Sequence, residues 1–175
     1  MEQNKKLILV ATAVVVLIGA FLGYRTFGNG TLVVEMTDPP RDWGQATNVY
    51  IKYSSVDIHR ADAGNQTGWI KAVDSEAWMD LTDTLNSSKT LGTKSLQAGK
   101  YNLVRFEIME AVVTINGANY TASVASGKLN IAIIQGGVTI NAGQTSSLLI
   151  DITPKITGSE TQGYRLTPAA KALPN

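Results

Sequence analysis

The stretch Leu96–Ile108, LQAGKYNLVRFEI, predicts the central strand of the protein. Its apolar residues alternate, which places Val104, Phe106 and Ile108 on one face of an extended chain. The other face is expected to carry Tyr101, Leu103, Arg105 and Glu107. Alternation with a period of two is typical of a half-buried antiparallel strand, because successive side chains leave a sheet on opposite sides. Gly99 precedes the strand and supplies the positive φ that a tight turn requires.

Two local patterns predict further extended structure on either side of this stretch. Residues 48–60 alternate, but the phase slips at Ser54–Ser55, which predicts a β-bulge or a bend between sheets. Asn116–Gly117 separates two alternating segments, and an Asn-Gly step in that position is a strong hairpin signal.

Turn residues recur throughout the chain and divide it into about nine to eleven short strands, with no helix expected after residue 24. The polar segment 82–93 is expected to be a loop, and residues 171–175 a frayed tail. Closely spaced strands without intervening helices favour an all-β fold. We therefore expect a two-sheet antiparallel β-sandwich over residues 31–170, with Greek-key connections like those of immunoglobulin or prealbumin domains.

The composition excludes several classes of protein. The 175 residues include no cysteine, which rules out disulfides, thiolate metal sites and a cysteine nucleophile. Setting aside the N-terminal Lys5, Lys6 and Glu2 leaves 13 basic and 13 acidic residues out of 15 and 14. A neutral domain without a basic cluster lacks the electrostatic footprint of a nucleic-acid-binding protein.

The pattern of the N-terminal residues predicts a membrane segment. Lys5 and Lys6 precede an apolar run from Leu7 to Leu22, as in an export signal or in the positive-inside flank of an anchor. As a helix the run would cover about 24 Å, slightly less than the ~30 Å hydrocarbon core. We expect residues 1–24 to form a transmembrane signal-anchor, with a long cleaved signal peptide as the alternative, followed by a linker over residues 25–30.

Two motifs resemble those of the domain of unknown function 4382 family, which occurs in bacteria and archaea. They are GTLVVEMTDPP at Gly30–Pro40 and LQAGKY at Leu96–Tyr101, and the resemblance extends to Thr167. It implies a lipoprotein or membrane-tethered β-sandwich outside the cytoplasm, supplies no activity, and so assigns no catalytic residue. This chain lacks the acylated cysteine of the lipoprotein members, so its apolar segment would replace the lipid as the tether.

Few side chains qualify as metal ligands. His59, the only histidine, has Asp57 and Asp62 nearby, but two ligands on one strand face do not close a transition-metal site. We expect His59 to lie instead at a solvated strand end. An acidic stretch surrounds Trp78 and offers hard oxygen ligands of the kind that bind Ca²⁺. Its carboxylates are Asp74, Glu76, Asp80 and Asp83. The alternative is a solvated loop in which these residues form turns.

The three tryptophans are candidates for binding sugar rings, which stack on exposed indoles. Trp43 follows two prolines in a polar loop and is expected to be the most exposed of the three. Trp69 and Trp78 lie in or near predicted strands, where they form part of such a platform or pack into the core.

Four Asn-x-Ser/Thr tripeptides match the N-glycosylation pattern, at Asn29, Asn65, Asn86 and Asn119. Most fall in predicted turns or loops. They are compatible with cell-surface glycosylation in an archaeon, although such tripeptides also arise by chance in chains rich in Asn and Thr.

The sequence predicts a non-catalytic domain on the cell surface. It contains no Gly-x-Ser-x-Gly elbow and no phosphate-binding glycine motif, so no enzyme activity is expected. The first expectation is a structural, adhesive or assembly role. The alternatives are a carbohydrate-binding module that binds surface glycans through the tryptophans and a calcium-binding surface domain.

Overall fold

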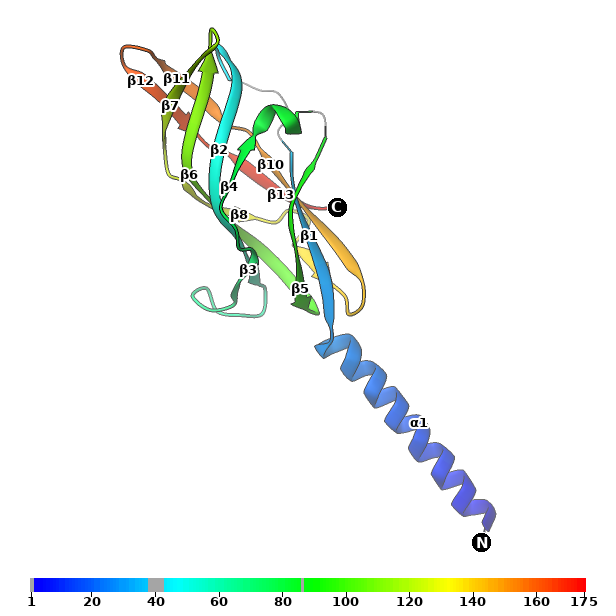
Figure 1. The fold of residues 1–175 in the computed structure, drawn as a ribbon. Coiled ribbons are helices and arrows are strands. Elements are labelled where there is room, and N and C mark those ends of the chain that lie inside the picture. Colours follow the sequence, from blue (N-terminus) through cyan, green and yellow to red (C-terminus); the bar gives the residue numbers. More distant parts are fainter. Residues whose placement is uncertain (1, 38–42, 86) are drawn as a thin grey trace.

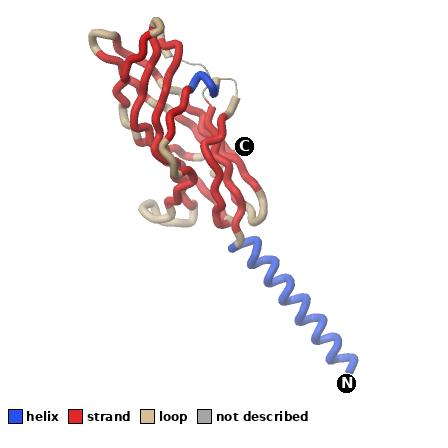
Figure 2. Tube along the Cα trace, in the orientation of Figure 1, coloured by secondary structure: helices blue, strands red, loops and turns tan. Residues whose placement is uncertain are grey.

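A computed structural model describes residues 2–37, 43–85 and 87–175. One helix precedes a body built almost entirely of strands (Figures 1 and 2). In chain order the elements are α1 Glu2–Phe27, β1 Asn29–Thr37, β2 Ala46–Arg60, β3 Trp69–Val73, β4 Ala77–Asp80, the 3-10 helix η1 Leu81–Thr84, β5 Lys89–Gln97, β6 Gly99–Ile115, β7 Ala118–Val124, β8 Lys128–Ala132, β9 Val138–Ile140, β10 Thr145–Ile152, β11 Lys155–Ser159, β12 Gly163–Thr167 and β13 Ala170–Pro174.

The strands form two sheets. The smaller sheet has the order β13-β10-β1-β5. The larger has nine strands in the order β11-β12-β7-β6-β2-β3, with β4 paired to β2, and β8 and β9 paired to β6. Both sheets are mixed, because β1 runs parallel to β10 and β12 runs parallel to β7. The expectation of purely antiparallel sheets is wrong at these two pairs, which join segments distant in sequence.

The central strand is longer than the sequence predicts. The alternating segments on either side of residue 109 form one strand, β6, which pairs along most of its length with β2. Val104, Phe106 and Ile108 are buried, as alternation predicts. Tyr101 is also fully buried, contrary to its predicted outward orientation, because the β2–β6 register shifts between His59 and Arg60.

The local turn predictions are confirmed. The register of β2 against β6 shifts between Tyr53 and Val56, which is the predicted bulge at Ser54–Ser55. Asn116 and Gly117 adopt φ values of 53° and 79° and join β6 to β7 as a hairpin. Gly99 adopts a positive φ at the start of β6.

Three predicted irregular segments are largely regular. The expected linker over residues 25–30 forms the end of α1 and the start of β1, apart from Gly28. The other two are the polar segment 82–93 and the tail. Two thirds of the segment 82–93 belongs to η1 and β5, and β5 pairs antiparallel with β1 at an edge of the smaller sheet. The predicted frayed tail is β13, which pairs with β10 and buries Ala172 completely. Backbone pairing with a neighbouring strand orders both segments, whose own side chains are mostly too polar or too small to predict a strand.

A single buried cluster contains residues from both sheets. Leu32, Val34 and Met36 enter it from β1, and Val104 and Phe106 enter it from β6. The ring centroids of Phe106 and Tyr53 lie 5.7 Å apart. The side of the nine-stranded sheet that faces away from this cluster is called the outer face below.

Helix α1 projects away from the strands (Figure 1). The apolar side chains over residues 8–22 of this helix are exposed on all sides; Leu9, Val15 and Leu17 each expose about 70% of their surface. Among the described residues, no helix combines the length and hydropathy required to cross a membrane.

Candidate ligand-binding face

The outer face carries an exposed indole beside a tyrosine. Trp78 on β4 lies opposite Lys52 of β2, and Tyr50 of β2 lies opposite Val112 of β6. Because residues directly opposite in a sheet share a face, all four side chains lie on the outer face. Trp78 exposes 50% of its surface, the largest exposure of an aromatic side chain among the described strands.

Tyr50, Trp78, Val112 and Asn119 line a shallow groove of about 250 Å³. Its surface is largely apolar, because two aromatic rings and a valine form most of it. The side-chain oxygen of Asn119 accepts a hydrogen bond of 2.7 Å from Thr114, which fixes the amide at the rim. An apolar floor with a polar rim is the arrangement that binds small polar molecules with one flat, hydrophobic side.

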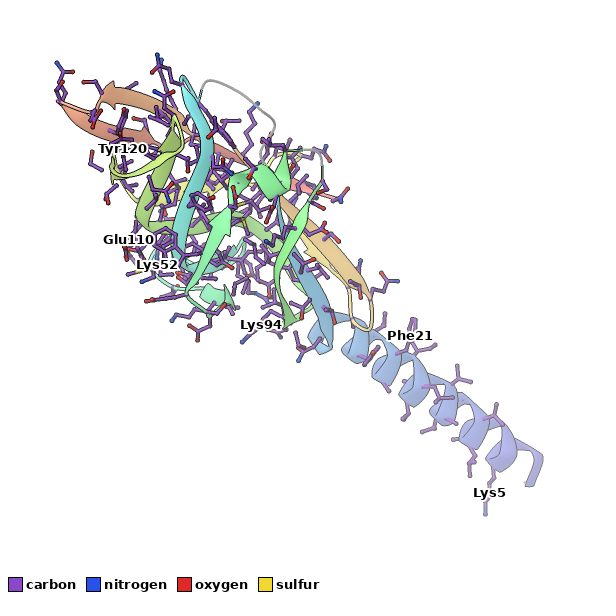
Figure 3. All side chains as sticks on the ribbon, turned by 45° about the horizontal axis from the view of Figure 1, so that its top comes forward. Lys5, Phe21, Lys52, Lys94, Glu110 and Tyr120 are labelled. Atoms are coloured by element: carbon purple, nitrogen blue, oxygen red, sulfur yellow. The ribbon has the colours of Figure 1, made fainter. Side chains whose placement is uncertain are left out.

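Two ion pairs that share one lysine border the groove. The ammonium group of Lys52 lies 3.4 Å from Glu76 and 3.3 Å from Glu110. Figure 3 labels Lys52 and Glu110 side by side. Hydrogen bonds to Glu110 and to Glu76 raise the pKa of Lys52 above its usual value. Lys52 therefore stays charged at physiological pH and holds both carboxylates beside Trp78.

A polar trough of about 510 Å³ continues along the outer face from Glu76. Its lining consists of Ser54, Ser55, Asp57, Lys71, Asp74, Ser75, Glu76 and Glu107. The β2 bulge places two serines there in succession. One oxygen of Asp57, Oδ1, is buried and accepts no hydrogen bond from any described residue.

Trp69 lies beyond the trough, and its indole is already covered. The guanidinium carbon of Arg105 lies 4.0 Å from the ring centroid, and the ring of His59 lies 4.9 Å away at a tilt. The indole N–H donates to the carbonyl of Asn65 at 3.3 Å. Trp69 is thus packed between neighbours, as the alternative to a sugar platform predicts.

Trp43 is half-buried rather than the most exposed tryptophan. It packs against the core and lines a cavity of about 330 Å³ with residues that include Ile115, Ile156 and Tyr164. The prediction that Trp43 is the most exposed tryptophan is wrong, because residues of the core pack against its indole. Trp78 is the most exposed of the three.

The four carboxylates proposed as calcium ligands do not form one cluster, because only Asp74 and Glu76 of the four line the trough. Asp74 pairs with Lys71 at 2.8 Å, Glu76 with Lys52, and Asp83 with Lys89 at 3.2 Å. Asp80 instead accepts hydrogen bonds from Thr82 and Asn48. Among the described residues, no three His, Cys, Asp or Glu side chains are grouped to hold a metal ion.

His59 is buried rather than a solvated strand end. Only 3% of its surface is exposed, and its ring nitrogens lie 3.3 Å from Oδ1 of Asn102 and 3.1 Å from the carbonyl of Gly64. The loop 61–68 covers the ring. His59 therefore supports the local structure of β2.

Three of the four glycosylation candidates are exposed. Asn29 begins β1, Asn65 lies in the loop over His59, and Asn119 lies at the rim of the groove. Asn86 lies outside the described residues.

Sequence reasoning did not identify Tyr50 and Asn119 as groove residues. A signal for Tyr50 was present, because the alternation that buries Val49 and Ile51 necessarily turns Tyr50 outward. A signal for Asn119 was also present, because the two-residue turn at Asn116–Gly117 places Asn119 directly opposite Thr114.

No curated protein and no solved structure matches the chain significantly. A family model does match, over residues 29–168, which span all strands from β1 to β12. The chain belongs to the family described as domain of unknown function DUF4382.

Proposed function

We propose that this protein is a non-catalytic, adhesive domain that binds glycans through the outer face of its large sheet. The observation that carries the proposal is the half-exposed indole of Trp78 beside Tyr50. The two rings and Val112 supply a flat apolar surface, and Asn119 supplies hydrogen-bonding groups at its edge. One face of a sugar ring is apolar and its edges are hydroxylated, so its chemistry complements this groove.

The finer architecture that we propose is a β-sandwich. Support comes from the single core, which takes residues from both sheets. This arrangement leaves the outer face of the larger sheet free for a ligand. Greek-key connectivity stays a prediction.

We further propose that α1 holds the domain at a membrane surface outside the cytoplasm. Support comes from the apolar side chains that α1 exposes around its circumference and from the N-terminal Lys5. Exposed leucine and valine side chains are costly in water and favourable in lipid. The exposed Asn29 and Asn65 are compatible with glycosylation at a cell surface.

A glycan array tests the proposed binding. The full chain, kept in detergent, is compared with Trp78→Ala, Trp78→Phe and Ile134→Ala, the last of which removes another exposed apolar side chain. We expect Trp78→Ala to weaken binding about tenfold or more, as loss of a central aromatic contact does. Trp78→Phe should retain part of the affinity, and Ile134→Ala all of it.

Running the same array with added calcium and with a chelator separates the two ligand-binding alternatives. Equal binding in both conditions is expected, because the four acidic candidates already have other partners. Binding that requires calcium would instead favour a calcium-dependent surface domain. A wild-type chain that binds no glycan, or binds equally well as Trp78→Ala, would contradict the proposal.

A further inference from the structure

A polar hollow of about 680 Å³ lies on the outer face near its β11 edge, lined by residues of β7, β11, β12 and the turn between the last two strands. The strand register places Arg165 of β12 directly opposite Ser123 of β7 and Thr157 of β11. These three side chains point away from the core, because their chain neighbours Ile156 and Leu166 are buried. The hollow therefore opens on the same side of the sheet as the groove.

The guanidinium group of Arg165 is a charge without a partner in the described part of the chain. Of the three arginines whose side chains the structure describes, Arg60 pairs with Asp62 at 2.7 Å and Arg105 stacks on Trp69. Arg165 forms neither a hydrogen bond nor an ion pair with any described residue. The other described residues that line the hollow are uncharged. The N–H donors of this guanidinium are thus available to an anion.

The groups around Arg165 suit a carboxylate. Thr121 and Thr157 are exposed in the hollow, and neither hydroxyl bonds to another described residue. Glu160, in the turn between β11 and β12, interacts with the phenol of Tyr120 instead. A guanidinium binds a carboxylate through two parallel N–H···O hydrogen bonds, and hydroxyl groups can donate to the lone pairs that remain.

The hollow adjoins the groove at β7. Asn119 lines the groove, and Thr121, two residues further along the same face of β7, lines the hollow, which corresponds to about 7 Å. Val112 of the groove also lies directly opposite Thr121. Four strand spacings, or about 19 Å, separate β4 from β12. A glycan with one ring on Trp78 would therefore reach Arg165 by crossing β2, β6 and β7.

The charges on the opposite side of the groove give this ligand a direction. Glu76 and Glu110 lie beside Trp78, where Lys52 pairs with both. The trough beyond Glu76 is lined by further carboxylates. Like charges placed together are unfavourable, so an acidic ring is disfavoured on the Trp78 side and favoured at Arg165.

We propose that the outer face binds a glycan in which neutral and uronic-acid rings alternate, with a neutral ring on Trp78 and a carboxylate on Arg165. This inference rests on the proposed glycan binding and names its substrate class. Arg165 is the specificity-determining residue, because its guanidinium distinguishes a ring that carries a carboxylate from a ring that carries a hydroxymethyl group at the same carbon.

Calorimetric titration of the full chain in detergent tests the inference with two tetrasaccharides that differ only in charge. The first alternates N-acetylglucosamine with glucuronic acid, and the second is the same chain after reduction of its carboxyl groups to alcohols. We expect the acidic chain to bind about fivefold more tightly, which is the upper range of an exposed ion pair. This preference should weaken at high salt, whereas the affinity of the reduced chain should stay constant.

Three variants locate the origin of the preference. Arg165→Gln should abolish it while leaving the affinity for the reduced chain unchanged, and Arg165→Lys, which keeps the charge without the planar fork, should retain part of it. Lys171→Gln is the matched control, because it removes one positive charge from β13 in the smaller sheet, and it should preserve the preference. Melting temperatures establish that each variant is folded.

The outcomes separate this inference from the function on which it rests. Equal wild-type affinity for the two tetrasaccharides, an unchanged preference in Arg165→Gln, or an equal loss in Lys171→Gln would overturn the role of Arg165 while Trp78-dependent binding still stood. Binding of neither tetrasaccharide would do the same if other glycans on the array bind through Trp78. Binding of neither, together with an array on which Trp78→Ala behaves as wild type, would overturn both.

Discussion

The carboxylate of Asp80 accepts a hydrogen bond from the backbone N–H of Thr82, 2.9 Å away, at the first turn of η1. Its other oxygen accepts from the amide of Asn48 on β2 at 3.2 Å. Asp80 thereby caps the short helix and ties it to the large sheet. The position of this candidate calcium ligand is thus explained by the cap and by the hydrogen bond from Asn48.

Asp80→Ala should lower the free energy of unfolding by about 1–2 kcal/mol, because a capping side chain is lost. Urea denaturation measures this change. The matched variant Asp83→Ala removes an exposed carboxylate paired with Lys89 and should cost less than about 1 kcal/mol. Equal effects of the two substitutions would contradict the capping role.

Phe106→Ala should lower the free energy of unfolding by about 3–5 kcal/mol. The ring is completely buried, and its removal leaves a cavity beside Tyr53 between the two sheets. Phe106→Leu keeps most of the volume and should cost markedly less. Chemical denaturation of both variants tests the order, and similar losses would argue against a tightly packed core at this position.

Alkaline pH should destabilise the protein through Tyr101. Burial raises the pKa of Tyr101 above its usual value of 10.0, while in the unfolded chain the phenol ionises near that value. The neutral phenol therefore contributes its full stabilisation below pH 10 and loses it as the pH rises further. The free energy of unfolding should fall above pH 10, and fall less steeply in Tyr101→Phe.

Urea denaturation in small steps of pH measures that difference in slope. At neutral pH, Tyr101→Phe should itself cost about 1 kcal/mol, since its hydroxyl donates to the carbonyl of Gln97 at 3.0 Å. Identical slopes above pH 10 for both proteins would assign the alkaline loss to other groups.

Substitution of two glycines by alanine should separate steric collision from backbone strain. At Gly30 a Cβ would collide with the carbonyl oxygen of Asn141 and lie 2.8 Å from Cγ2 of Ile140, so Gly30→Ala should cost about 3 kcal/mol. At Gly117 a Cβ meets no atom within 4 Å, and only the φ of 79° opposes the change. Gly117→Ala should therefore cost about 1–2 kcal/mol. Thermal unfolding compares the two, and the reverse order would contradict this assignment.

Local sequence patterns predict much of this fold. The bulge at Ser54–Ser55 follows from a slip in alternation, and the β6–β7 hairpin follows from Asn116–Gly117. Both depend on a few consecutive residues. Pairing between distant segments leaves no such pattern, and so neither the parallel β1–β10 pair nor the edge strand β5 could be predicted.

The sequence predicts which type of residue forms the candidate site, but not which of those residues is exposed. Sequence identifies the tryptophans as candidate sugar platforms, but their exposure depends on neighbours from other strands. Arg105 comes from β6 to cover Trp69, and core residues from several strands enclose Trp43. Half of the surface of Trp78 stays exposed, at one side of a shallow groove.

The position of β1 directly after α1 has a mechanical consequence. A pulling force on a tethered α1 would enter the domain along β1, which is hydrogen-bonded to β10 on one side and β5 on the other. Both ladders run along the direction of pull, so they would have to shear as a whole instead of unzipping one bond at a time. A strand held by two such ladders resists a load that is applied at its N-terminal end.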